Sequence, residues 1–208
     1  MALSETLTET SICNQALGRI GALRIKGNVE TEDSVHAIQC RLHYEQTRDS
    51  LIRSYSWRFA SGRETLSQDS STPDFEWDFQ YPLPDDFMAM KSIFEGRFSS
   101  INFRNIALEG DLLLTNEDTM EIRYIKKVTD VSKFDSLFVK VLVLLLADVL
   151  LGPLAGGDPR IQKKIDDALD KLMPAVRALD GQETNTAGRF ESGTWNDARS
   201  QGRDPMRL

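Results

Sequence analysis

Two histidines and one cysteine stand at helical spacing in the first quarter of the chain. His36, Cys40 and His43 occupy positions i, i+4 and i+7, so a helix places them on one side. Imidazole and thiolate groups are the usual ligands of zinc. Along a helix, however, His36 and His43 are roughly 10 Å apart, which is too far for one ion to bind both. Cys13 is the only other thiol. We therefore predict a semi-polar packing face and no metal site.

A second group that could carry chemistry is a pair of carboxylates. Asp85 and Asp86 follow Pro84, and two nearby carboxylates can act as acid and base in glycoside hydrolysis. Acidic residues are abundant in this chain, however, and those in the preceding segment alternate outward as solvated side chains do. Neither histidine lies in a turn typical of a nucleophile, and residues 152–158 lack the Gly-Lys-Ser/Thr of a phosphate-binding loop. We predict no catalytic residue and no cofactor.

The C-terminal segment, residues 181–208, has a composition of its own. It has no lysine and little aliphatic material, so it cannot bury enough apolar surface to fold by itself. It is either a disordered tail or an arm that becomes ordered on a partner. In the second interpretation two aromatic anchors and three arginines make the contacts: Arg189, Phe190, Trp195, Arg199 and Arg203.

Charge and composition limit the classes of function. The chain has 208 residues, a net charge of −7 and a sequence pI near 5.0. Such a balance argues against a surface that holds nucleic acid by neutralising phosphates, but it suits a wall that nucleic acid slides past. The first residues lack the basic and apolar parts of a secretory signal. Two cysteines are too few for a disulfide framework, so we expect synthesis in a reducing cytoplasm.

The most apolar stretch, residues 134–151, must organise the helical elements. Lys140 and Asp148 interrupt it, which argues against a membrane span of about 20 apolar residues. Its apolar residues lie on more than one stripe, which is typical of a helix enclosed by others. We predict that it is the centre of a helical bundle, and that aspartate in place of Leu145 unfolds the protein.

Three further helices are predicted around this stretch. The first begins near Thr8 and ends at Gly21, and the second runs from about Asp33 to Tyr55. The expected apolar face of the second helix is Val35, Ile38, Leu42, Leu51 and Ile52. The glycine- and proline-rich residues 152–157 should end the helix over 134–151. The last helix begins at Asp158–Pro159, and Pro174 should kink or end it.

Between the second helix and the central stretch the pattern is typical of strands. Aromatic residues alternate with polar ones over 75–81, and alternation with period two predicts a half-buried strand. Residues 109–111 (Glu-Gly-Asp) predict a tight hairpin. Five more short strands are expected, over 88–94, 98–103, 105–108, 111–115 and 120–128. These predict a small antiparallel sheet or barrel.

Several segments resemble one known family. They are residues 12–22 (ICNQALGRIGA), 37–44, 48–60 (RDSLIRSYSWRFA) and 81–86 (YPLPDD), followed by the apolar helix, the glycine loop and the last helix. In sequence and order they are similar to the head-to-tail adaptors of short-tailed bacteriophages, the group that includes tail tubular protein A. The resemblance covers roughly residues 10–175 and consists of packing patterns, with no catalytic fingerprint.

The resemblance implies a structural role in the virion. It implies a homo-oligomeric ring of twelve subunits between the portal protein and the tail nozzle protein, which closes the head while genome DNA passes through the lumen without specific binding. It also implies a C-terminal arm along the portal. Some members of the family have been linked to cell-wall hydrolysis, but the matched segments supply no catalytic position.

The combined expectation is an α+β fold, a helical bundle built from N- and C-terminal segments with an inserted small antiparallel β domain and an extended C-terminal arm. The expected parts are residues 1–60 (helical), 61–131 (β), 132–180 (helical) and 181–208 (arm). The favoured function is a phage adaptor without enzymatic activity or a membrane span, made in the host cytoplasm and located in the virion tail. The alternatives are a peptidoglycan hydrolase that uses Asp85 or Asp86, and a cellular partner-binding module whose gene has no portal or tail genes beside it.

Overall fold

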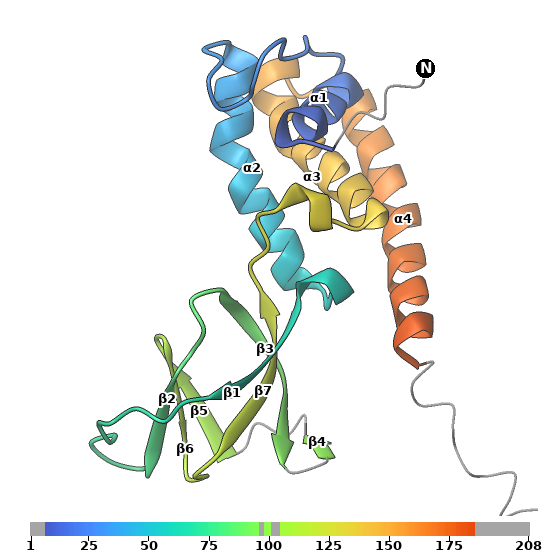
Figure 1. The fold of residues 1–208 in the computed structure, drawn as a ribbon. Coiled ribbons are helices and arrows are strands. Elements are labelled where there is room, and N and C mark those ends of the chain that lie inside the picture. Colours follow the sequence, from blue (N-terminus) through green and yellow to red (C-terminus); the bar gives the residue numbers. More distant parts are fainter. Residues whose placement is uncertain (1–6, 96–97, 101–104, 186–208) are drawn as a thin grey trace, which may run out of the picture. The chain divides into compact units, whose positions relative to one another are not determined.

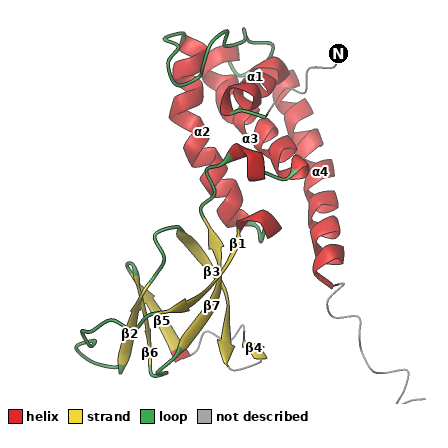
Figure 2. Ribbon diagram, viewed as in Figure 1, coloured by secondary structure: helices red, strands yellow, loops and turns green. Residues whose placement is uncertain are grey.

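The computed structural model describes residues 7–95, 98–100 and 105–185 of the chain. These residues contain four α-helices: α1 (Glu9–Ile20), α2 (Val35–Ser54), α3 (Ser136–Ala155) and α4 (Pro159–Asn185). Helices α1 and α2 precede the strands, α3 follows them, and these three pack together. The strands are β1 (Ser61–Leu66), β2 (Phe79–Pro82), β3 (Phe87–Glu95), β4 (Phe98–Ser100), β5 (Ile106–Glu109), β6 (Leu112–Thr115) and β7 (Met120–Lys126). Helices and strands are segregated (Figure 2). The α+β fold with strands inserted between N- and C-terminal helices is confirmed.

The chain divides into two compact units, Met1–Leu169 and Asp170–Leu208, so that α4 crosses the division. The first unit holds all the strands together with α1, α2 and α3. In the second unit the described residues are the later part of α4, to Asn185.

Helix ends follow the local signals in the sequence. Thr8 caps α1, where its hydroxyl oxygen accepts from the backbone of Ser11 at 3.1 Å, and Gly21 ends α1 at φ 74°. The side chain of Ser34 caps α2, and that of Asp135 caps α3. The predicted starts and ends of α1 and α2 are therefore confirmed to within two residues.

The central helix α3 is surrounded as predicted. α1 and α2 both pack on it (Figure 1). Among the described residues it is the helix long and apolar enough to cross a membrane, with a mean hydropathy of 2.4, and more than half of that stretch is buried inside the protein. Ten of its residues are buried, all of them apolar: Phe138, Val139, Val141, Leu142, Val143, Leu144, Leu146, Ala147, Leu150 and Leu151. Burial among other helices therefore explains the apolar composition of α3.

The end of α3 lies within the predicted stop at residues 152–157. The helix continues past Gly152 and Pro153 to Ala155, with Gly156 as its left-handed cap at φ 65°. Pro153 removes one backbone donor in the last turn, yet Val149, whose carbonyl oxygen loses its partner, is 40% exposed and open to water. Leu145 is only half-buried, so the wholly buried Leu146 is the position where a charge should unfold the protein.

The strands form two antiparallel sheets with one shared apolar core. One sheet has the order β1-β7-β3-β4 and the other β2-β6-β5. The tight turn predicted at residues 109–111 is confirmed, because Glu109 pairs with Leu112 across Gly110, which has φ 59°. The shared core consists of Leu66, Tyr81, Ile93, Leu113, Met120, Ile122 and Tyr124.

The strand predictions needed two corrections in this region. The strand expected over 75–81 begins only at Phe79, because Glu76 lies at φ 72° and Phe75 is 80% exposed. Positive φ breaks the extended conformation that period-two alternation requires. The strand β1 was not predicted, since Gly62, Arg63 and Glu64 give it no apolar alternation.

The last helix extends further than expected. Pro174 lies inside α4, which continues to Asn185. The carbonyl oxygen that Pro174 leaves without a partner belongs to Asp170, and both residues are exposed, so water can satisfy it. The expected arm therefore begins with helix over residues 181–185, and its remainder lies outside the described residues.

Candidate functional site

The clearest candidate for a binding surface is the solvent-facing side of α2. Val35, Ile38 and Leu42 are 62%, 44% and 65% exposed, and their spacing places them on one side of the helix over its first two turns. We call these three residues the outer α2 face. Of the five apolar residues predicted to share one face of this helix, Leu51 and Ile52 are buried, whereas these three lie at the surface. A continuous apolar stripe left in water is typical of a surface that a partner covers.

The opposite side of α2 explains why this face points outward. Ala37, Cys40, Tyr44, Arg48 and Leu51 recur at spacings of three and four residues and are buried. This second stripe is mixed in polarity, so hydrophobicity alone did not identify it. Small or amphipathic side chains allow α2 to approach α1 and α3, and the larger aliphatic side chains of the first two turns are left outside.

Acidic and amide groups border the outer α2 face. Asp33 precedes it, and Glu45 and Gln46 continue the same side of the helix one turn further on; all three are exposed. Arg41 does not neutralise this border, because its Nη1 donates to the carbonyl oxygens of Val29 and Glu30, each at 2.8 Å. The surface is therefore an apolar centre with a polar, acidic rim, which is the usual composition of a protein interface.

A buried arginine fixes the inner side of the same helix. The side chain of Arg48 is 1% exposed, and its Nε donates to Asp49 Oδ1 at 2.8 Å. Glu45 Oε1 lies 3.8 Å and Glu9 Oε1 4.0 Å from its guanidinium nitrogens, and the Tyr44 ring centroid lies 5.8 Å from its central carbon. A buried guanidinium requires such partners, so this cluster holds α2 in one rotation with the apolar residues outward.

Asp49 extends this network to the strands. Its second carboxylate oxygen, Oδ2, forms an ion pair with Lys127 Nζ at 3.0 Å, and Lys127 directly follows β7. Partial burial opposes ionisation of Asp49, but hydrogen bonds from Arg48 and Lys127 outweigh it and lower its pKa. Burial also raises the pKa of Glu9, which Arg48 only partly offsets. The network thus connects α1, α2 and the end of β7, and its role is to position elements.

The suggested metal ligands do not converge. Cys40 is wholly buried, whereas His36 and His43 are half-buried. Within residues 7–95, 98–100 and 105–185, no three side chains of histidine, cysteine, aspartate or glutamate gather as metal ligands would. The nearby Cys13 thiol on α1 lowers the pKa of Cys40, and Cys40 and burial together raise the pKa of Cys13. The spacing of residues along α2 could not indicate this neighbour, because Cys13 lies on α1.

The carboxylates proposed for hydrolysis have different surroundings. Asp85 is exposed, and Asp86 Oδ1 accepts a hydrogen bond from the hydroxyl of Tyr124 on β7 at 2.9 Å. The backbone oxygen of Asp86 accepts from Lys127 at 2.7 Å. Burial, followed by the hydrogen bond to Asp86, raises the pKa of Tyr124. Asp86 therefore connects the turn before β3 to β7 and the residue that follows it.

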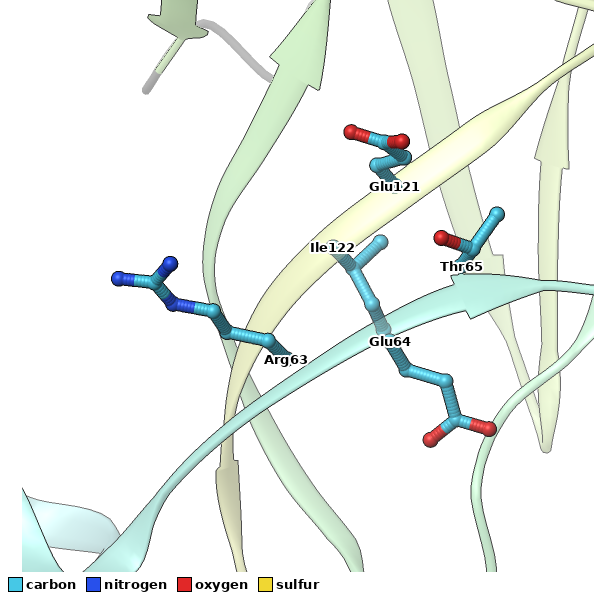
Figure 3. A pocket seen from close by; sticks show the side chains of 5 residues that line it. All are labelled: Arg63, Glu64, Thr65, Glu121 and Ile122. Atoms are coloured by element: carbon cyan, nitrogen blue, oxygen red, sulfur yellow. The ribbon is translucent and has the colours of Figure 1, made fainter.

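A shallow hollow of about 250 Å³ lies over β1 and β7, lined by Arg63, Glu64, Thr65, Glu121 and Ile122. Figure 3 shows that the carboxylates of Glu64 and Glu121 point in different directions from their strands, and that Arg63 points away from both. Catalysis by paired carboxylates needs the two groups to flank one bond. The carboxylates of this hollow therefore do not have the arrangement that paired acid–base catalysis needs.

The five residues assigned to the arm, Arg189, Phe190, Trp195, Arg199 and Arg203, lie outside the described residues. No protein-family model matches this chain, and no curated protein matches it. The candidate site within the described residues is therefore the outer α2 face with its acidic rim. The sequence pattern predicted its residues as part of the apolar face of the second helix, but it did not indicate that they lie in solvent.

Proposed function

We propose that this protein is a structural adaptor subunit of a short-tailed bacteriophage, located in the virion tail. In this proposal, copies of the chain form a ring between the portal protein and the tail nozzle protein, and genome DNA passes through the lumen without specific binding. Twelve subunits are the number that the family resemblance implies. The ring has no enzymatic activity in this proposal, and the arm, residues 181–208, binds the portal.

The observation that carries the proposal is the outer α2 face. Val35, Ile38 and Leu42 are exposed although the same helix buries a second stripe on its other side. A subunit that assembles laterally needs such a face, since covering apolar side chains with a partner stabilises the complex by roughly 25 cal/mol per Å².

The charge balance is consistent with a conduit. A net charge of −7 disfavours binding of DNA through its phosphates, and a conduit wall must not retain the genome that moves along it. The apolar stripe with an acidic rim on α2 would then meet protein and not nucleic acid. The two properties together favour an assembly role over a nucleic-acid-binding role.

The arm assignment is tested with the portal protein encoded in the same genome. A chain truncated after Asn185 keeps the whole of α4, so we expect it to fold as the full chain does but to stop co-sedimenting with portal rings. Replacing both anchors, Phe190→Ala with Trp195→Ala, should weaken binding at least tenfold. Glu191→Ala is the matched control, and it should bind as the full chain does.

Three results would contradict parts of the proposal. Full co-sedimentation of the truncated chain would refute the arm as the portal contact. Failure of the intact chain to bind portal rings would refute the adaptor function itself. Hydrolysis of purified peptidoglycan that disappears in Asp85→Asn would show an enzyme instead, and Asp85 is the suitable position because its exposed side chain can change without loss of the fold.

A further inference from the structure

The acidic rim of the outer α2 face limits which surface can cover it. Asp33 and Glu45 are exposed, and the side chain of Glu45 is 74% exposed. Arg48 does not cancel this charge, because Glu9 and Asp49 share the same guanidinium group. If two copies met through this face alone, two acidic rims would lie together, and like charges oppose association. The surface that covers this face therefore needs an apolar centre with basic neighbours.

One exposed apolar side chain elsewhere in the chain has basic neighbours. Outside the outer α2 face, four large apolar side chains are exposed in the described part of the chain: Leu23, Phe75, Leu108 and Val149. An acidic residue adjoins each of the last three in the sequence, namely Asp74 and Glu76, Glu109, and Asp148. Leu23 instead precedes Arg24 and follows Arg19 in the last turn of α1, and both arginines are exposed. We call Arg19, Leu23 and Arg24 the α1 tip.

Hydrogen bonds on either side of Leu23 hold the α1 tip in one conformation. The backbone nitrogen of Ala22 donates to the last turn of α1 at 3.0 Å. The side chain of Asn14 accepts from the backbone nitrogen of Ile25 at 2.8 Å and donates to its oxygen at 3.0 Å. A surface that is ordered before it binds loses less conformational entropy on binding. Leu23 and Leu42 are 75% and 65% exposed, so they do not cover each other within one chain.

We propose that the α1 tip of one copy of the chain docks on the outer α2 face of the next copy. Leu23 lies against Ile38 and Leu42 in this contact, and the two arginines of the tip meet the acidic rim. The inference rests on the proposed function and deepens it, because it names the surface that covers the outer α2 face. The apolar centre supplies affinity, and the opposite charges fix the register.

The symmetry of this contact leads to a ring. The two surfaces differ, so a pair of copies still has one free α1 tip and one free outer α2 face, and further copies add to both. A contact between two different surfaces closes into a ring when its rotation is a simple fraction of a turn. Each contact is small, so two free copies associate weakly, whereas copies held side by side on a portal ring meet at a high effective concentration.

The experiment links the two surfaces through thiols introduced into separate full-length chains. The variants Leu23→Cys and Leu42→Cys are mixed at high concentration and treated with diamide, first in solution and then on portal rings. We expect a linked dimer in which tryptic peptide 20–24 is joined to peptide 42–48. Leu23→Cys mixed with Ser50→Cys is the matched control, because Ser50 is exposed on the same helix but outside the outer α2 face and its rim. The control should give about tenfold less linked dimer.

A change of charge at the α1 tip tests the role of the acidic rim. Adding Arg24→Glu to the Leu23→Cys chain places a carboxylate against the rim, so we expect about tenfold less linkage to Leu42→Cys. Arg24→Lys keeps the positive charge and should link as the unchanged tip does. All of these positions are exposed, and circular dichroism checks that each variant is folded.

The outcomes on portal rings separate this inference from the adaptor function. Portal rings that fill with subunits while no link joins positions 23 and 42 would overturn the inference and leave the adaptor function standing. A link that forms in solution between chains that do not bind portal rings would support the contact and refute the adaptor function. Equal linkage with Ser50→Cys and with Leu42→Cys would overturn the inference, as would the absence of any link both in solution and on rings.

Discussion

The helical region around α3 and the sheet region from β1 to β7 fill their interiors with different kinds of side chain. All ten buried residues of α3 are apolar. The sheet core includes two tyrosines, and their hydroxyls donate to Glu117 at 3.0 Å and to Asp86 at 2.9 Å. Hydrophobic packing has no direction, whereas each buried hydroxyl needs one partner at one place. The packing of α3 is therefore specified by its apolar pattern, and the sheet core by particular pairs.

This difference predicts the largest effect for a charge in the helical core. Leu146→Asp places a carboxylate at a position with 0% exposure and no polar partner in the apolar stripe, so we expect a loss of about 4 kcal/mol or more and an unfolded chain. Circular dichroism during thermal denaturation measures it. Lys140→Asp on the exposed side of the same helix is the control, and equal stability of the two variants would refute the central position of α3.

The sheet region should respond to a much smaller change. A methyl group at Gly62 on β1 would lie 2.7 Å from two ring carbons of Tyr124. That ring cannot move aside freely, because its hydroxyl is bonded to Asp86. We expect Gly62→Ala to cost about 1–3 kcal/mol in urea unfolding, against a much smaller loss for Arg63→Ala on the exposed side of β1. A neutral Gly62→Ala would mean that the sheet core is not fixed by this pair.

The ion network between α2 and β7 should produce a dependence on pH. Asp49 has a pKa below its ordinary value of 3.8 in the folded protein, so its contribution is complete above 3.8 and is lost as the pH falls through the folded value. We expect Asp49→Asn to cost about 2 kcal/mol at pH 7 and to reduce the loss of stability below pH 4. Urea unfolding at several pH values measures both. If the free energy of unfolding of the two proteins depended on pH in the same way, Asp49 would not be the source of the acid sensitivity.

The smallest effect on stability is expected at the outer α2 face. Leu42 is 65% exposed, so Leu42→Asp should change the free energy of unfolding by less than about 1 kcal/mol. The same change should abolish assembly, which separates a binding role from a core role. Ser50→Asp, an exposed position on the same helix two turns further on and outside this face and its rim, is its matched control. Strong destabilisation by Leu42→Asp would show that Leu42 packs inside the protein, as its spacing had suggested.

How much could be predicted from the sequence follows the same division. Caps at Thr8, Ser34 and Gly21 act within a few residues, so the bounds of α1 and α2 could be predicted. The sequence pattern predicted extended backbone around Glu76, and it could not indicate the positive φ of this residue, which is a property of the folded turn. Sequence patterns report on local structure, and the sheet region depends on contacts between distant segments.

The candidate site was harder to predict for a related reason. Val35, Ile38 and Leu42 have the spacing of a core face, and only the competing stripe that contains Cys40 and Arg48 places them outside. The burial of an arginine cannot be anticipated without its partners, of which Glu9 comes from another helix. Cys13, which lowers the pKa of Cys40, likewise lies on another helix.

Mass photometry of portal rings mixed with the full chain, with Leu42→Asp and with Ser50→Asp tests the central claim most directly. We expect the full chain and Ser50→Asp to add the mass of the same number of subunits to each ring, while Leu42→Asp stays folded and leaves the rings incomplete. Portal rings that take up Leu42→Asp as fully as the unchanged chain would contradict the assignment of the outer α2 face as the assembly surface.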